Sequence, residues 1–171
     1  MFYKWRLKVV QPKIFGRILD VGCGDRCLQG AVGIDILPEF HLKQLSASLP
    51  ILSETFNCVC LMATINYVPV GSTQKVIQEC HRVLKKYGRL VITCTTPLGG
   101  FIHRLFRWKQ PRGISRQEMV ALVEKDGLFR LVYDRPFMLG LNRVYVFGKE
   151  TAKVESYVAI QKIVKEEVHH Q

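Results

Sequence analysis

The sequence predicts an α/β fold, a doubly wound and mostly parallel sheet that forms a three-layer sandwich with helices on its two faces. Two observations predict this class. Apolar runs that do not alternate with polar residues occupy residues 17–21, 31–36, 56–63 and 89–95, as expected for strands buried on both faces. A helical pattern at residues 72–86 separates the last two runs, which predicts right-handed crossovers between parallel strands.

The size of the chain is that of one domain. Its 171 residues are 48% hydrophobic and 23% charged, which is enough to bury one core and excludes a disordered or fibrous chain. We divide it into a basic N-terminal arm at residues 1–16, a core at 17–149, and a C-terminal helix or tail at 150–171.

The elements around the sheet follow from local signals. Only residues 25–30 separate the loop after the first strand from the second strand, so the first crossover is shortened to one helical turn at most. The helix at 72–86 is expected to take Ser72 as its N-cap and to end before Gly88.

The C-terminal third predicts two helices and a hairpin. Residues 101–108 form a short helix, and Ser115 with Glu118 makes a capping box for a second helix that runs to about residue 125. Residues 128–134 and 142–147 alternate apolar and polar side chains, which predicts a C-terminal antiparallel hairpin.

The positive charge is concentrated in two segments. The formal charge is +11, with 25 Lys and Arg against 14 Asp and Glu. Residues 1–19 hold five basic residues and no acid, residues 80–117 hold nine and no acid, and the remainder is slightly acidic. This distribution indicates an anionic partner bound at a definite place.

The second basic segment contains an amphipathic helix. Its apolar arc is made of Phe101, Ile102, Leu105, Phe106 and Trp108, and His103, Arg104 and Arg107 lie on the other arc. A basic helix with a tryptophan is typical of peripheral contact with a membrane interface. The alternative is that the apolar arc packs on the domain.

Composition also bears on location and on metals. The longest uncharged run is too short and too interrupted to span a membrane, and the N-terminus lacks the continuous apolar stretch of a secretory signal, so we expect a cytoplasmic protein. The six cysteines contain no C-x-x-C pair and are expected to be free thiols. A zinc site through Cys23, Cys27 and a histidine is disfavoured, and no metal is predicted.

The chemistry is expected at residues 18–25, Ile-Leu-Asp-Val-Gly-Cys-Gly-Asp. A strand that ends in Gly-x-Gly lets the backbone approach a ligand at the carboxyl edge of the sheet, and Asp35 ends the next strand, where an acid can bind ribose hydroxyls. Cys27 stands where a dinucleotide fingerprint needs its third glycine, and there is no Gly-Lys-Ser/Thr phosphate loop. The pocket therefore suits an adenosine ligand without phosphates.

Four segments in the right order carry a resemblance to a known family. They are Asp20-Val21-Gly22-Cys23-Gly24, Val32-Gly33-Ile34-Asp35-Ile36, Leu49-Pro50 with Thr55-Phe56-Asn57, and the run from Arg82 to Leu90. Residues 18–149 resemble the Rossmann-like class I S-adenosylmethionine-dependent methyltransferases, and within them the small-molecule group that includes quinone-biosynthesis enzymes.

The resemblance implies S-adenosylmethionine as cofactor and a set of residues that bind it. The glycine loop would wrap the methionine part, and the acid after the second strand would bind the ribose. The implied residues are Asp20, Val21, Gly22, Cys23, Gly24, Asp35, Ile36, Ser46 and Met62. Ser46 enters because the acid that relatives often place before Leu-Pro is missing, and Gln44 is the alternative to it.

The catalytic residues are less determined. Tyr67 follows the fourth strand of the family's fold and His103 the fifth, where a base or a substrate ligand can stand, but Tyr67 also fits a packed aromatic and His103 a solvated residue. Asn66-Tyr67 departs from the acidic or histidine pair common in the family.

We expect methyl transfer to a small-molecule or lipid-like acceptor, amphipathic and anionic. Two alternatives stay open. An RNA methyltransferase would explain the charge, although the chain lacks the Asn/Asp-Pro-Pro-Tyr motif of base-amino methyltransferases and a separate RNA-binding module. A degenerate fold acting as a partner subunit would explain the departures from the family pattern. The oligomeric state is not predicted.

Overall fold

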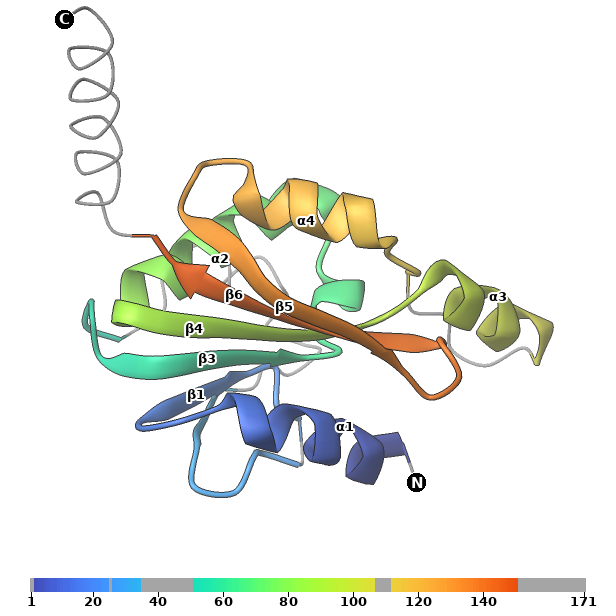
Figure 1. Ribbon diagram of the computed structural model, residues 1–171, viewed down its shortest axis with the longest axis horizontal. Helices are drawn as coiled ribbons and strands as arrows, with labels where there is room; N and C mark the ends of the chain where they lie inside the picture. Colours follow the sequence, from blue (N-terminus) through green and yellow to red (C-terminus); the bar gives the residue numbers. More distant parts are fainter. Residues whose placement is uncertain (1, 25, 35–50, 107–111, 151–171) are drawn as a thin grey trace, which may run out of the picture.

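A six-stranded sheet organises the described part of the chain, and its strands lie in the order β2-β1-β3-β4-β6-β5 (Figure 1). The computed structural model describes residues 2–24, 26–34, 51–106 and 112–150. The strands are β1 (Ile18–Val21), β2 (Val32–Ile34), β3 (Phe56–Met62), β4 (Leu84–Thr95), β5 (Phe129–Phe137) and β6 (Asn142–Lys149).

The pairing is parallel from β2 to β4, and β6 runs antiparallel to both β4 and β5. This confirms the mostly parallel sheet with a C-terminal antiparallel hairpin. Because parallel strands share a direction, β1, β3 and β4 end at the same edge, and the segments that follow them meet there.

Helices cover the two faces of the sheet, which confirms the three layers. On one face lies α1 (Phe2–Val10), followed by the 3-10 turn η1 (Gln11–Lys13). The other face carries α2 (Val70–Val83) and α4 (Arg116–Glu124), while α3 (Pro97–Leu105) projects beyond the end of β4 (Figure 1).

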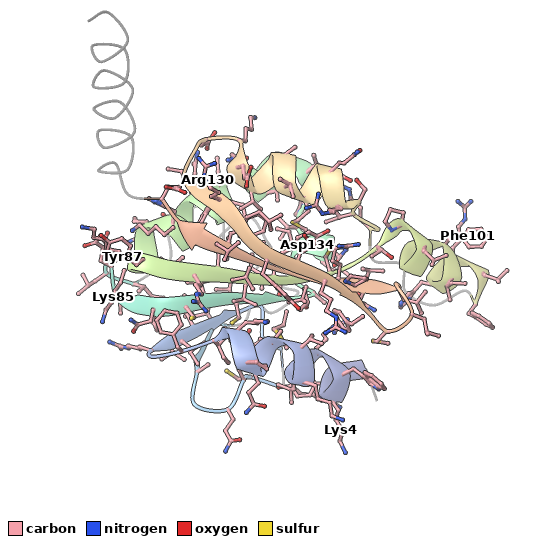
Figure 2. All side chains as sticks on the ribbon, in the orientation of Figure 1. Lys4, Lys85, Tyr87, Phe101, Arg130 and Asp134 are labelled. Atoms are coloured by element: carbon pink, nitrogen blue, oxygen red, sulfur yellow. The ribbon has the colours of Figure 1, made fainter. Side chains whose placement is uncertain are left out.

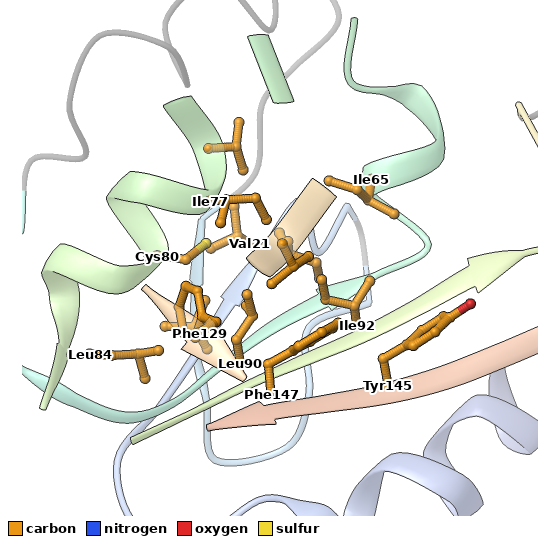
Figure 3. Close-up of a cluster of buried hydrophobic side chains, with 14 of the residues drawn as sticks. Val21, Ile65, Ile77, Cys80, Leu84, Leu90, Ile92, Phe129, Tyr145 and Phe147 are labelled. Carbon is orange, nitrogen blue, oxygen red and sulfur yellow. The ribbon is translucent and has the colours of Figure 1, made fainter. Parts of the chain in front are cut away.

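Each face of the sheet has its own hydrophobic cluster. Leu90 and Ile92 of β4, with Tyr145 and Phe147 of β6, pack against α2 and α4 (Figure 3). Between them, Val91 and its neighbours on β6 point to the opposite face, toward α1. The alternation along the strands therefore buries both faces, as the unbroken apolar runs predict.

The boundaries of α2 differ from the prediction. Pro69 stands at the N-cap position, so Ser72 is inside the helix and not its cap. The helix ends at Val83 because Leu84 already pairs with Phe56 of β3. The ladder is irregular after that pair, and Tyr87 adopts a positive φ of 63°.

Three further segments take forms that the sequence did not fully predict. The expected basic arm is helical from residue 2 to 10, because Leu7, Val9 and Val10 pack on the sheet. Helix α3 starts at Pro97, where Thr96 Oγ1 accepts a hydrogen bond from Gly99 N at 3.2 Å. The hairpin is longer than predicted, with its turn at residues 138–141.

The described part of the crossover between β1 and β2, residues 22–24 and 26–31, contains no helix, as its shortness predicts. Trp108, Arg107 and the tail at residues 151–171 lie outside the described residues.

Candidate active site

The glycine loop after β1 is held by its neighbours on both sides. Gly22 and Gly24 have φ values of 75° and 58°, a region that L side chains rarely adopt. Gly22 N donates to Ile34 O of β2 at 2.7 Å, and Thr64 Oγ1 donates to Val21 O at 2.9 Å. The loop is thereby clamped between β2 and the segment that follows β3.

Asp20 lies beneath this loop with its carboxylate buried. The residue is 1% exposed, and its Oδ2 accepts a hydrogen bond from Leu28 N at 2.9 Å. Its Oδ1 has no hydrogen-bond partner among the described residues. Burial raises the pKa of Asp20, and the bond from Leu28 opposes this only in part. One buried carboxylate oxygen therefore receives no hydrogen bond from the described residues.

The shortened crossover packs directly on β2 in place of a helix. Leu28 is buried against the α1 face, and Ala31 N donates to Leu28 O at 3.0 Å. A Cβ on Gly33 would lie 2.7 Å from the sulfur of Cys27 and 2.8 Å from that of Cys23. The two thiols therefore lie over the glycine of β2, and their position depends on the missing side chain there.

Helix α1 reaches the same edge. Tyr3 Oη donates to Cys27 O at 3.3 Å, which joins the helix to the crossover. One turn later, the Nε of Arg6 is buried without a hydrogen-bond partner among the described residues. Burial lowers the pKa of Arg6, and the nearby phenol of Tyr67 opposes that effect.

The sequence analysis noted the charge of residues 1–19 but did not place Tyr3 and Arg6 at the site. Their spacing of three residues, beside the apolar Leu7 and Val10, was the available signal, because residues three and four apart share one face of a helix.

Asn66 is a structural residue. It is 4% exposed, its Oδ1 accepts from Thr95 N at 3.0 Å, and its Nδ2 donates to Thr95 O at 3.3 Å and to Arg112 O. All of its donors and its acceptor oxygen are engaged within the fold. These hydrogen bonds, which we call the Asn66 clip, tie the end of β4 to the chain after β3. They explain the departure from the family pattern at this position.

The structure gathers part of the predicted site. Asp20, Val21, Gly22, Cys23 and Gly24 lie together at the end of β1, and Met62 is half-buried at the end of β3, in the cluster under α1. Asp35, Ile36 and Ser46 lie outside the described residues.

The two catalytic candidates lie on separate elements that follow strands ending at the same edge of the sheet. Tyr67 ends the 3-10 turn η2 (Ile65–Tyr67) and is half-exposed near Arg6, while His103 is half-buried on α3. The roles of all these residues stay predictions.

Two findings concern alternatives. The described residues contain no group of three or more His, Cys, Asp or Glu side chains placed to hold a metal ion. No helix within them is both long and apolar enough to span a bilayer.

Comparisons with known proteins agree with this geometry. Residues 19–92 match the family model described as a methyltransferase domain. No curated protein sequence matches the chain significantly.

Solved structures share the fold at low sequence identity. A Pyrococcus horikoshii protein superposes with a TM-score of 0.65 at 17% identity, over 86% of this chain and 91% of its own. A Thermotoga maritima S-adenosylmethionine-dependent methyltransferase has a TM-score of 0.64 at 18% identity, over 86% and 89%. One from Methanosarcina mazei has 0.62 at 18% identity, over 82% and 96%. Residues 19–92 therefore resemble a methyltransferase domain, and the chain shares the fold of solved S-adenosylmethionine-dependent methyltransferases.

Proposed function

We propose that this chain transfers the methyl group of S-adenosylmethionine to a small-molecule or lipid-like acceptor that carries a negative charge. The observation that carries the proposal is Asp20, whose buried carboxylate keeps one oxygen unpartnered among the described residues beneath the glycine loop. A buried charged oxygen is costly unless a donor reaches it, so the site favours a cationic ligand group.

The residues present fit the methionine part of the cofactor. Its ammonium group is a donor of the kind that Asp20 Oδ1 lacks. A Cβ built on Gly24 would meet nothing within 4 Å, so the loop leaves open space on that side, whereas Gly22 is closely packed on Thr64. Asp35, by the family resemblance, is proposed to bind the ribose.

The acceptor is proposed to lie beside Arg6 and Tyr67. Arg6 presents a guanidinium whose Nε is buried without a partner in the described structure, and a carboxylate or phosphate on the acceptor would supply one. Tyr67 stands next to it and is half-exposed. Such contacts hold the nucleophile in line with the methyl group, and positioning supplies much of the rate in a transfer of this kind.

When bound, the cofactor supplies an electrophilic methyl group on a sulfonium. A base is needed only for acceptors that must lose a proton during attack. Tyr67 and His103 are the proposed candidates for that role, since both follow strands that end at the site edge.

Labelling with S-adenosylmethionine that carries a radioactive methyl group tests the proposal. The full chain is incubated with a small-molecule and lipid extract, and in parallel with total RNA. We expect label in the extract, and Gly22→Arg, whose side chain clashes with Thr64 and so displaces the loop, to abolish it. If only the RNA becomes labelled, the proposed acceptor class is wrong and the acceptor is RNA. The basic segments are also compatible with RNA binding.

A further inference from the structure

Helix α3 holds large apolar side chains in water. Leu98, Phe101, Leu105 and Phe106 are each between 53% and 63% exposed. The first three recur at intervals of three and four residues, so they share one face of the helix. Only Gly99 of α3 is buried. The face of α3 that Leu98, Phe101 and Leu105 share is therefore largely exposed in the described structure.

A second apolar projection lies in the turn between β5 and β6. Leu139 is 97% exposed at its tip, and both Met138 and Leu139 have positive φ values, 54° and 55°. The turn closes through a bond from Leu141 N to Met138 O at 3.1 Å. A leucine in this backbone region is strained, and a strained residue held fully in water gives the fold no packing in return.

The helix and the turn form one surface. Thr96, the N-cap of α3, donates from its Oγ1 to Gly140 O at 2.7 Å. Gly99 approaches the carbonyl of Leu141 so closely that a Cβ there would clash with it. Figure 1 shows the turn next to α3 at one end of the molecule, the end that also holds the start of α1.

The charge around this surface is positive. Arg104 and Arg135 are exposed there, whereas Arg112 is paired with Glu118, and the acid nearest in the hairpin, Asp134, is paired with Arg116 and Arg143. Phe101 projects at this end of the molecule (Figure 2).

We propose that α3 and the β5–β6 turn form a docking surface for an anionic lipid membrane. Its leucine and phenylalanine side chains enter the interface, and its arginines meet the lipid headgroups. Other occupants fit less well. A second copy bound through the same face would set Arg104 and its neighbours against like charges. Three of the five exposed apolar side chains, Leu98, Leu105 and Leu139, have no ring that could stack on a nucleic-acid base. The proposal concerns docking and does not depend on methyl transfer.

Vesicle flotation of the full chain tests the surface. We expect binding to vesicles of phosphatidylcholine with phosphatidylglycerol, little binding to phosphatidylcholine alone, and loss of binding as salt rises. Leu139→Gly and Phe101→Ser should each weaken binding at least about tenfold, because each removes one inserted apolar side chain. Arg104→Gln should weaken binding and reduce its salt dependence.

The variants contain their own controls. Leu139→Gly relieves the positive φ, so a loss of binding cannot come from a loss of folding. Tyr87→Gly removes an equally exposed aromatic beside Lys85 at the opposite end (Figure 2) and should bind as the wild type does.

Three results would overturn the proposal. They are no flotation of the wild-type chain, flotation that Leu139→Gly and Phe101→Ser leave unchanged, and a dimer in sedimentation analysis that Phe101→Ser dissociates. Cofactor binding, measured separately, distinguishes each of them from failure of the proposed function.

Discussion

The side chain of Thr64 occupies the space beside Gly22 where any other residue would place its Cβ. That Cβ would lie 2.6 Å from Thr64 Oγ1, and the same oxygen donates to the carbonyls of Val21 and Gly22, at 2.9 and 3.3 Å. One threonine after β3 thus fixes the loop after β1, and it requires a glycine there.

This contact predicts a coupled pair of substitutions. Gly22→Ala should lower the free energy of unfolding by about 2 to 4 kcal/mol, from the positive φ and from the clash with Thr64. Adding Thr64→Ala should recover the part of the unfolding free energy that the clash removes, and should leave the loss that comes from the positive φ. Urea unfolding of the two single variants and the double variant measures the coupling, and additive losses would contradict the contact.

Gly24 is the matched control for this pair. It shares the positive φ, but a Cβ there meets nothing within 4 Å. Gly24→Ala should therefore cost only about 1 kcal/mol, with no dependence on Thr64.

Asp20 gives the site a pH dependence. Its pKa is raised in the folded state, so the folded chain holds this proton more tightly than the unfolded chain. Its contribution to stability is therefore full below the ordinary aspartate range and is lost as the pH rises through the raised pKa. Asp20→Asn should remove this dependence in denaturation curves measured across that range.

Ligand binding should show the opposite trend. If the carboxylate pairs with the ammonium of the cofactor, affinity for S-adenosylhomocysteine falls as the pH drops through the same pKa. Asp20→Asn should weaken binding about tenfold or more and flatten the pH profile. Unchanged affinity in Asp20→Asn would show that the ammonium binds elsewhere.

Arg6 is expected to bind the acceptor and, in its absence, to lower the stability of the fold. Arg6→Met should raise the melting temperature, because it replaces a half-buried guanidinium, whose Nε has no hydrogen-bond partner among the described residues, by an apolar side chain. Arg6→Gln should raise the KM for the labelled acceptor far more than it lowers kcat, with Lys4→Gln on the same helix as control.

Two ligands separate the acceptor from the cofactor. Arg6→Gln should bind S-adenosylhomocysteine within about twofold of the wild-type affinity. If it loses that affinity but keeps affinity for methylthioadenosine, which lacks the amino acid part, Arg6 binds the cofactor's carboxylate and the assignment to the acceptor is wrong.

Asn66 should behave as part of the fold. Asn66→Ala leaves Thr95 N and two carbonyls without their partner and should cost about 2 to 4 kcal/mol. Asn66→Asp should also destabilise, because a carboxylate oxygen would face the carbonyls of Thr95 and Arg112. If Asn66→Ala or Asn66→Asp unfolds at the same urea concentration as the wild type, the structural role of the Asn66 clip is contradicted.

Tyr87 offers a stabilising change. It is 70% exposed with a φ of 63°. Tyr87→Gly removes the strain of a side chain in the left-handed region and should raise the free energy of unfolding by about 0.5 to 1 kcal/mol. Thermal unfolding measures it, and a decrease would show that the ring contact with Lys86 matters more than the strain.

The sheet could be predicted from the sequence because its strands are continuous apolar runs, bounded by glycines, prolines and polar residues. The missing crossover helix followed from chain length alone. The start of α2 was misplaced, since a good capping residue, Ser72, lies three residues after Pro69, which initiates the helix by its fixed φ. Local signals cannot decide between two adjacent starts.

The site was predictable where it depends on local sequence and not where it depends on tertiary contact. The loop of Gly22 and Gly24 was evident from its spacing after a strand. Thr64 and Arg6 were not, because their importance comes from packing on segments about 40 and 60 residues away. The structural role of Asn66, which the sequence shows only as a departure from the family pattern, is likewise evident only from its bonds to Thr95.

Isothermal titration calorimetry of the full chain with S-adenosylhomocysteine tests the central claim most directly. We predict a single site that binds this product of the cofactor, that Gly22→Arg abolishes, and that weakens as the pH falls through the pKa of Asp20. Absence of heat at millimolar ligand, with the chain folded, would contradict the assignment of a working cofactor site to the loop after β1.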